Sequence, residues 1–183
     1  MRETKKITVS AMAVALGVVF MALGYFVEVL DLTVAALCSV IMIIVFVEIG
    51  KPYTFLVWLA TSLLGAIFYT SKLVWVTYFL LFGIYPILKA YIERAKRFLW
   101  IPLKLLFFNA VSPLMIFISE KLLGIPFFGE DLSIPFLEGR EWLFKLLVYL
   151  ALNVVLLVYD FFLTVMIRAY FSKFRDILRK VLK

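Results

Sequence analysis

Four ionisable side chains stand inside apolar segments, where a charge is costly and usually has a role. They are Glu48, Lys89, Lys104 and Asp160. Asp160 stands eight residues before Arg168, about 12 Å of helix rise, so its short side chain cannot easily reach water. We therefore expect Asp160 to form an ion pair with Lys89 or Lys104, which either fixes helix packing or belongs to a gate. The alternative for both lysines is extension of their long side chains to the membrane surface.

Neutral polar side chains accompany two prolines in the same part of the chain. Asn109 and Ser112 precede Pro113 in "FFNAVSP", and Tyr85 precedes Pro86 in "FGIYPILK". A proline inside a helix removes a hydrogen bond and kinks the helix, so polar groups beside two kinks favour a cavity. Interhelical hydrogen bonding that only holds the helices together is the open alternative. The predicted ligand pocket gathers polar and aromatic side chains from these segments, from the long outer connection and from the last apolar segment: Tyr85, Asn109, Ser112, Phe128, Trp142, Tyr149 and Asn153.

The chain lacks the residues of the common enzyme sites. It contains no histidine, one cysteine and no Gly-rich phosphate loop. The usual general base, the usual zinc ligands and a nucleotide cradle are therefore missing. We predict no enzymatic activity, no catalytic residues, no metal site and no cofactor.

Composition identifies the elements that must position these side chains. Hydrophobic residues make up 66% of the 183 residues and the mean hydropathy is +1.10, whereas soluble domains are about 45–50% apolar. We predict one all-α domain, residues 1–183, that forms a six-helix membrane bundle. An outer cap loop at 120–141 and a basic amphipathic tail at 169–183 complete it. The predicted spans are 7–28, 33–49, 53–70, 73–92, 99–119 and 142–168.

The positions of the basic residues predict the orientation, because cytoplasmic flanks collect Lys and Arg. With the N-terminus inside, 15 of the 19 basic residues fall on the inner side. Both termini are therefore expected in the cytoplasm of a multi-pass protein of the cell membrane. The net charge of +7 follows from this topology, so we expect membrane lipids and not nucleic acid as partners.

The first apolar segment, "ITVSAMAVA", is rich in small side chains, with Ala11 and Ala15 four residues apart. Small residues at this spacing let a second helix approach closely. Together with the six spans in about 180 residues, the inner termini and the basic start, the Ala-x-x-x-Ala pattern resembles the substrate-binding S components of bacterial energy-coupling factor (ECF) transporters.

This resemblance implies a function and a set of partners. In that family the first-helix alanines contact a transmembrane T subunit, which is driven by two ATPase subunits, so Ala11 and Ala15 would be kept small for this partner. The family binds a vitamin-like small molecule on the outer side, in a pocket of spans four to six, as part of an ABC-type importer. Two alternatives predict different behaviour: a non-transport scaffold of the MreD type binds no ligand, and an independent carrier or channel needs no ATPase.

Overall fold

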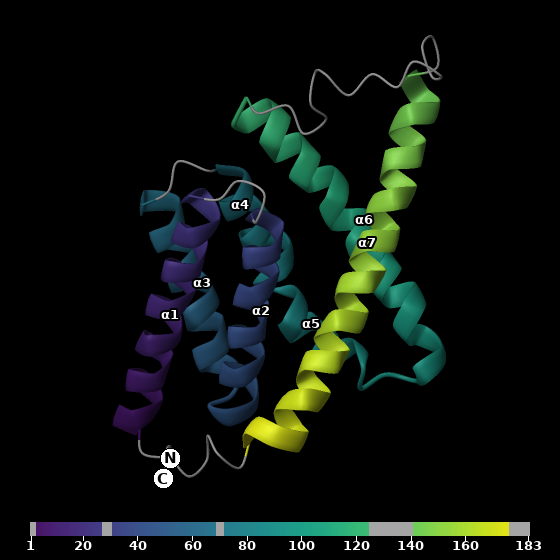
Figure 1. Cartoon of the computed structure of the whole chain (residues 1–183). Helices are drawn as coiled ribbons and strands as arrows, with labels where there is room; N and C mark the ends of the chain where they lie inside the picture. Colours follow the sequence, from purple (N-terminus) through teal and green to yellow (C-terminus); the bar gives the residue numbers. More distant parts are fainter. Residues whose placement is uncertain (1–2, 27–30, 69–71, 125–140, 176–183) are drawn as a thin grey trace.

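The computed structural model describes residues 3–26, 31–68, 72–124 and 141–175, and every regular element in these ranges is a helix. The chain runs up and down between two ends, so that neighbouring long helices are antiparallel (Figure 1). In chain order the elements are α1 (Glu3–Phe26), α2 (Asp31–Glu48), α3 (Lys51–Phe68), α4 (Lys72–Thr77), η2 (Tyr78–Phe82), α5 (Tyr85–Ile92), η3 (Arg97–Leu99), α6 (Trp100–Phe117), η4 (Ile118–Leu122), α7 (Glu141–Ala169) and η6 (Tyr170–Phe174).

Among the described residues, five helical segments are long and apolar enough to cross a membrane, as expected of a multi-pass membrane protein. The apolar part of α2, Thr33–Glu48, is shorter than these five. The five segments are Glu3–Gly24, Lys51–Phe68, Val74–Ile92, Arg97–Lys121 and Leu146–Lys173.

The central helix is α2, which packs against α1, α3, α4, α5 and α7. Its inward side chains differ in size and are buried: Ala35, Cys38, Met42 and Val45 are each 2% exposed or less. Small residues on α1 allow the close approach of its neighbours. The Cys38 thiol lies 3.6 Å from the Gly17 carbonyl oxygen, and a Cβ on Gly17 would meet Thr61 Cγ2 at 3.0 Å.

The fourth membrane segment is not one continuous α-helix. A π-helical turn, η2, is followed by a break at residues 83–84, after which α5 begins with Pro86 in its first turn. Proline fits there because a first-turn residue needs no N–H partner within its own helix. The break also brings Gly83 against Trp58, where an added Cβ would lie 2.3 Å from Trp58 Cδ1. Trp58 Nε1 donates a hydrogen bond to the carbonyl of Phe79, at 3.2 Å.

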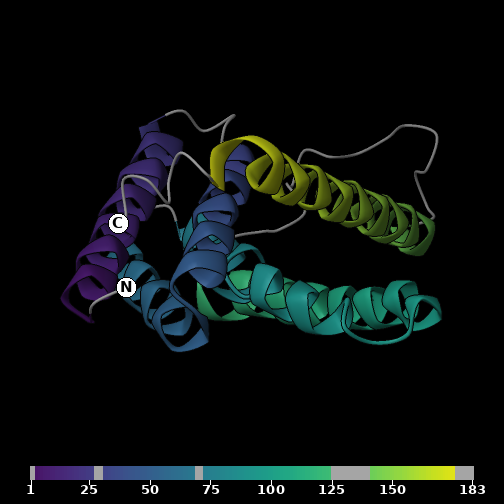
Figure 2. The same ribbon diagram turned by 90° about the horizontal axis from the view of Figure 1, so that it is seen from below.

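The helices α6 and α7 extend to one side of α1, α2 and α3 (Figure 2). They cross each other, and the end of α6 and the start of α7 diverge (Figure 1). Pro113 lies inside α6 without ending it. The helix continues through η4 to Leu122, past the predicted end of its span at residue 119.

Charges are distributed unequally between the two ends of the bundle. We call the end at which α1 begins, at the bottom of Figure 1, the basic end. The opposite end carries only a few basic residues among those described, including Lys72 and Lys121. At or near the basic end stand Lys5, Lys6, Lys51, Lys89, Arg94, Lys96, Arg97, Lys104, Arg168, Lys173 and Arg175.

The predicted cap and tail are only partly covered by the structure. Residues 120–122 of the predicted cap continue the helix as η4, and 125–140 lie outside the described residues. The predicted tail begins as a direct continuation of α7, because residues 170–174 form the π-helical turn η6. Residues 176–183 also lie outside the described residues.

Candidate functional site

The carboxylate of Asp160, on α7, lies among polar side chains from two other helices. Lys89 Nζ, on α5, contacts Asp160 Oδ1, and Lys104 Nζ, on α6, lies 2.7 Å from Oδ2. The Tyr85 hydroxyl donates to Oδ1 at 2.6 Å. Both carboxylate oxygens of Asp160 are therefore engaged, and the side chain is only 14% exposed.

A second carboxylate, Glu93, bridges the same two lysines. Its Oε1 lies 2.8 Å from Lys89 Nζ and 3.1 Å from Lys104 Nζ. Lys89 Nζ also donates to the Thr164 hydroxyl at 2.9 Å and to the main-chain carbonyl of Asp160 at 3.2 Å. Two cations thus face two anions. We call this group, Tyr85, Lys89, Glu93, Lys104, Asp160 and Thr164, the ionic cluster.

Helical spacing accounts for the geometry of the ionic cluster. Tyr85, Lys89 and Glu93 are four residues apart and share one side of α5 and its C-terminal cap, because residues four apart face the same way on a helix. Asp160 and Thr164 are related in the same way on α7, and the Thr164 hydroxyl donates back to the Asp160 carbonyl at 2.9 Å. The cluster therefore joins three helices through side chains that their own periodicity aligns.

Sequence reasoning expected Asp160 to pair with one of two lysines, and the structure brings it together with both. The sequence alone does not indicate that Glu93 and Thr164 join this group. The signal for Glu93 was its position four residues after Lys89, the spacing of ion pairs along a helix. The sequence predicts Tyr85 in the ligand pocket; in the structure its hydroxyl donates to Asp160 and its side chain is fully buried.

The ionic cluster joins α5, α6 and α7 through paired charges that are largely buried. Lys89 is 1% exposed, and a buried charge is tolerated only when paired and hydrogen-bonded. With two lysines and two carboxylates the charges balance. Removing one member leaves the remaining charges uncompensated inside the protein, so the contributions of the cluster residues to stability depend on one another.

Three of the other predicted pocket residues meet where α6 and α7 cross. Asn153 Nδ2 lies 3.3 Å from Asn109 Oδ1, and the Tyr149 hydroxyl lies 3.5 Å from the Asn109 carbonyl oxygen. That carbonyl is the one that Pro113, which has no N–H, leaves without its usual helical donor. We call Asn109, Tyr149 and Asn153 the crossing triad.

The remaining predicted pocket residues lie apart from the crossing triad. The Ser112 hydroxyl is buried and donates to the carbonyl of Phe108 on its own helix, at 2.8 Å. Trp142 is 68% exposed near the start of α7. Phe128 lies outside the described residues. The structure therefore brings together only part of the predicted pocket.

Ala11 and Ala15 both lie on the exposed side of α1. The opposite side of the helix makes the contacts with α2 and α3, and its buried residues include Ala13, Gly17 and Met21. Small residues thus occur on both sides of α1. Those on the buried side serve packing within this chain, and Ala11 and Ala15 are open to contact from outside it.

Known proteins add no further constraint on these residues. No family model, no curated protein and no solved structure matches this chain. Among the residues that the structure describes, no group of His, Cys, Asp and Glu side chains could hold a metal ion.

Proposed function

We propose that this protein is the membrane-embedded substrate-capture subunit of an ECF-type importer. It would bind a vitamin-like small molecule from the outer side of the cell membrane. It would then couple to a T subunit and two ATPase subunits. In this arrangement the basic end and both termini face the cytoplasm, in agreement with the preference of Lys and Arg for that side.

The observation that carries the proposal is the exposed position of Ala11 and Ala15 on α1. An alanine contributes little surface to lipid contact, but it lets the backbone of a partner helix come close. These alanines are not used for packing against α2 or α3, because Ala13, Gly17 and Met21 occupy that side. Their placement supports a partner helix that lies along this side of α1.

The crossing triad supports the second part of the proposal, the binding of a ligand. Asn109 is exposed although it lies in the middle of a segment long enough to span the membrane. Polar groups at membrane depth commonly mark substrate pathways. Amide and hydroxyl groups at this depth suit a small polar or partly apolar molecule.

The partner is identified by affinity purification of the tagged protein from its host membranes in mild detergent, followed by mass spectrometry. We expect a T-type membrane subunit and ATPases to co-purify. The double variant Ala11→Leu with Ala15→Leu should remain folded and lose them, because leucine side chains hold a partner helix away. A matched control, Ala110→Leu with Ala151→Leu, adds the same bulk to exposed alanines of α6 and α7 and should keep the partners.

Two results would contradict the proposal. If the partners still co-purify after both α1 substitutions, Ala11 and Ala15 do not form the contact with them. Recovery of cell-wall machinery without ATPases would favour the MreD-type scaffold, for which the same side of α1 would serve as a structural interface.

A further inference from the structure

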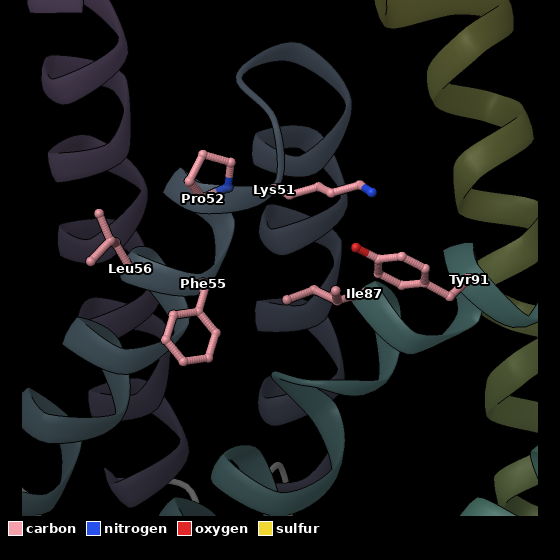
Figure 3. A pocket seen from close by; sticks show the side chains of 6 residues that line it. All are labelled: Lys51, Pro52, Phe55, Leu56, Ile87 and Tyr91. Atoms are coloured by element: carbon pink, nitrogen blue, oxygen red, sulfur yellow. The ribbon is translucent and has the colours of Figure 1, made fainter.

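A groove lies at the basic end between the start of α3 and the end of α5 (Figure 3). Its volume is about 660 Å³. The apolar part of its lining comes from Pro52, Phe55, Leu56 and Ile87, and the polar part from Lys51 and Tyr91. Figure 3 shows the Lys51 side chain reaching across toward α5 and the Tyr91 hydroxyl turned back toward α3.

The depth of these residues in the membrane follows from their place in the two helices. Lys51 is the first residue of one membrane-crossing segment, and Tyr91 is next to the last residue of another. Both therefore stand at the same membrane surface. Ile87 lies four residues further in, about 6 Å of helix rise. The groove is polar at the membrane surface and apolar directly below it.

The charge at the mouth of the groove is positive. Lys51 Nζ lies 4.6 Å from the centre of the Tyr91 ring, and the Arg94 guanidinium lies 5.6 Å from the same ring. These contacts hold two cations beside one aromatic side chain. In the described part of the chain, no ion pair joins a carboxylate to Lys51 or Arg94.

The carboxylates nearest in sequence bind other partners. Glu48 accepts a hydrogen bond from Tyr170 at 3.1 Å and lies 3.4 Å from Arg175 Nε. Glu93 belongs to the ionic cluster. The N-terminal end of α3 adds the partial positive charge of its helix dipole. An anion at the mouth would thus meet Lys51 and Arg94 without displacing an acidic side chain.

We infer that this groove binds one anionic phospholipid of the surrounding bilayer. The phosphate contacts Lys51 and Arg94, and an acyl chain lies along Phe55 and Ile87. The order of groups, basic at the surface and apolar below, matches the order of a phospholipid. Basic pockets between membrane helices on the cytoplasmic side suit such head groups. The inference is independent of the proposed importer function.

The first test compares lipids of different charge on the full-length protein. Native mass spectrometry in detergent follows the titration of dioleoyl phosphatidylglycerol and dioleoyl phosphatidylcholine. We expect tighter binding of one phosphatidylglycerol. The variant Lys51→Gln with Arg94→Gln should lower that preference by about tenfold or more, since each basic group near the surface contributes about a factor of five.

The matched control for this titration is Lys96→Gln, an exposed basic residue of the same end that does not line the groove. It should leave the preference unchanged. Equal loss in Lys96→Gln and in the double variant would overturn the inference, because it would reduce the effect to general charge. Competition by inorganic phosphate as strong as by the lipid would also overturn it, since the apolar part of the groove would then have no role.

The second test keeps both cations in place and identifies the occupant. Phe55→p-benzoylphenylalanine in bilayers of equal phosphatidylglycerol and phosphatidylcholine should cross-link phosphatidylglycerol in excess. The same label at Phe68, exposed at the far end of α3, should cross-link both lipids equally. A polypeptide as the main product at Phe55 in host membranes would instead assign the groove to a protein partner and overturn the inference.

Discussion

Besides its apolar packing, the helix α7 contacts its neighbours through two polar regions of contrasting chemistry. Near the basic end, the ionic cluster joins α7 to α5 and α6 through buried charges, with Lys104 Nζ 2.7 Å from Asp160 Oδ2. At the crossing of α6 and α7, the crossing triad supplies only neutral contacts, at 3.3 and 3.5 Å. The Asn153 Oδ1 atom there is buried without a hydrogen-bond partner in the structure.

This difference indicates where α6 and α7 are fixed and where they can adjust. A charge-assisted contact is about twice as strong as a neutral one, and a buried charge is costly to separate. Neutral contacts between membrane helices are weak, about 0.6 kcal/mol on average. We therefore expect the basic end to act as the anchor of α7, while the diverging ends rearrange around it.

The largest decrease in stability is expected from removing the carboxylate of Asp160, which both lysines share. Asp160→Leu leaves Lys89 and Lys104 with Glu93 alone, and loss of one partner of a buried ion pair costs about 3–5 kcal/mol. We expect a decrease of this order in the free energy of unfolding, measured in mixed detergent micelles.

A double-mutant cycle checks that the effect comes from the ionic cluster. Asp160→Leu with Lys104→Met restores a one-to-one balance between Lys89 and Glu93, so the double variant should lose less stability than the sum of the single variants. Strict additivity would show that the two side chains do not depend on each other. The basic end would then lose its role as the anchor.

A smaller decrease in the free energy of unfolding is expected when Glu93, the second carboxylate of the ionic cluster, loses its charge. Glu93→Gln keeps the shape of the side chain and removes its charge, while both lysines retain Asp160. Glu93 is 29% exposed, so the loss should lie near the lower limit for hydrogen bonds to charged groups, about 1.5 kcal/mol. The matched control is Glu120→Gln, exposed on η4, for which we expect no measurable change. Equal losses of stability in Glu93→Gln and Glu120→Gln would show that Glu93 does not help to anchor α7.

The sequence predicts the helical class and most segments of this fold because membrane helices must be long and apolar. The predicted span 53–70 corresponds to α3, Lys51–Phe68. For the segment before α5 the sequence predicts only a kink at Pro86. The structure places it at residues 83–84, where Gly83 packs against Trp58. That contact depends on a residue distant in sequence, which no local pattern reveals.

The ionic cluster illustrates the same limit at the level of a site. The depth of Asp160 predicts a basic partner, because an unpaired charge is costly inside an apolar segment and the sequence of that one segment shows its depth. The choice between Lys89 and Lys104 depends on how three helices cross, and the structure places both against Asp160. The sequence predicts that the crossing triad lines a pocket together with Ser112. The Ser112 hydroxyl instead donates to a carbonyl of its own helix. A serine in a membrane helix can bond either within its helix or to a ligand, and the sequence alone does not distinguish the two.

The smallest change in stability is expected at the crossing triad. Asn109→Leu, Asn153→Leu and the double variant should show a coupling energy of about 0.6 kcal/mol in the same unfolding assay, the average for hydrogen bonds between membrane helices. Ser112→Ala serves as control, because its hydroxyl bonds within α6, and it should show no coupling to Asn153→Leu. A coupling energy between the two asparagines as large as that between Asp160 and Lys104 would mean that α7 is fixed equally at both places. The diverging ends would then be as rigid as the basic end, because a second strong contact would prevent rotation of α7 about the first.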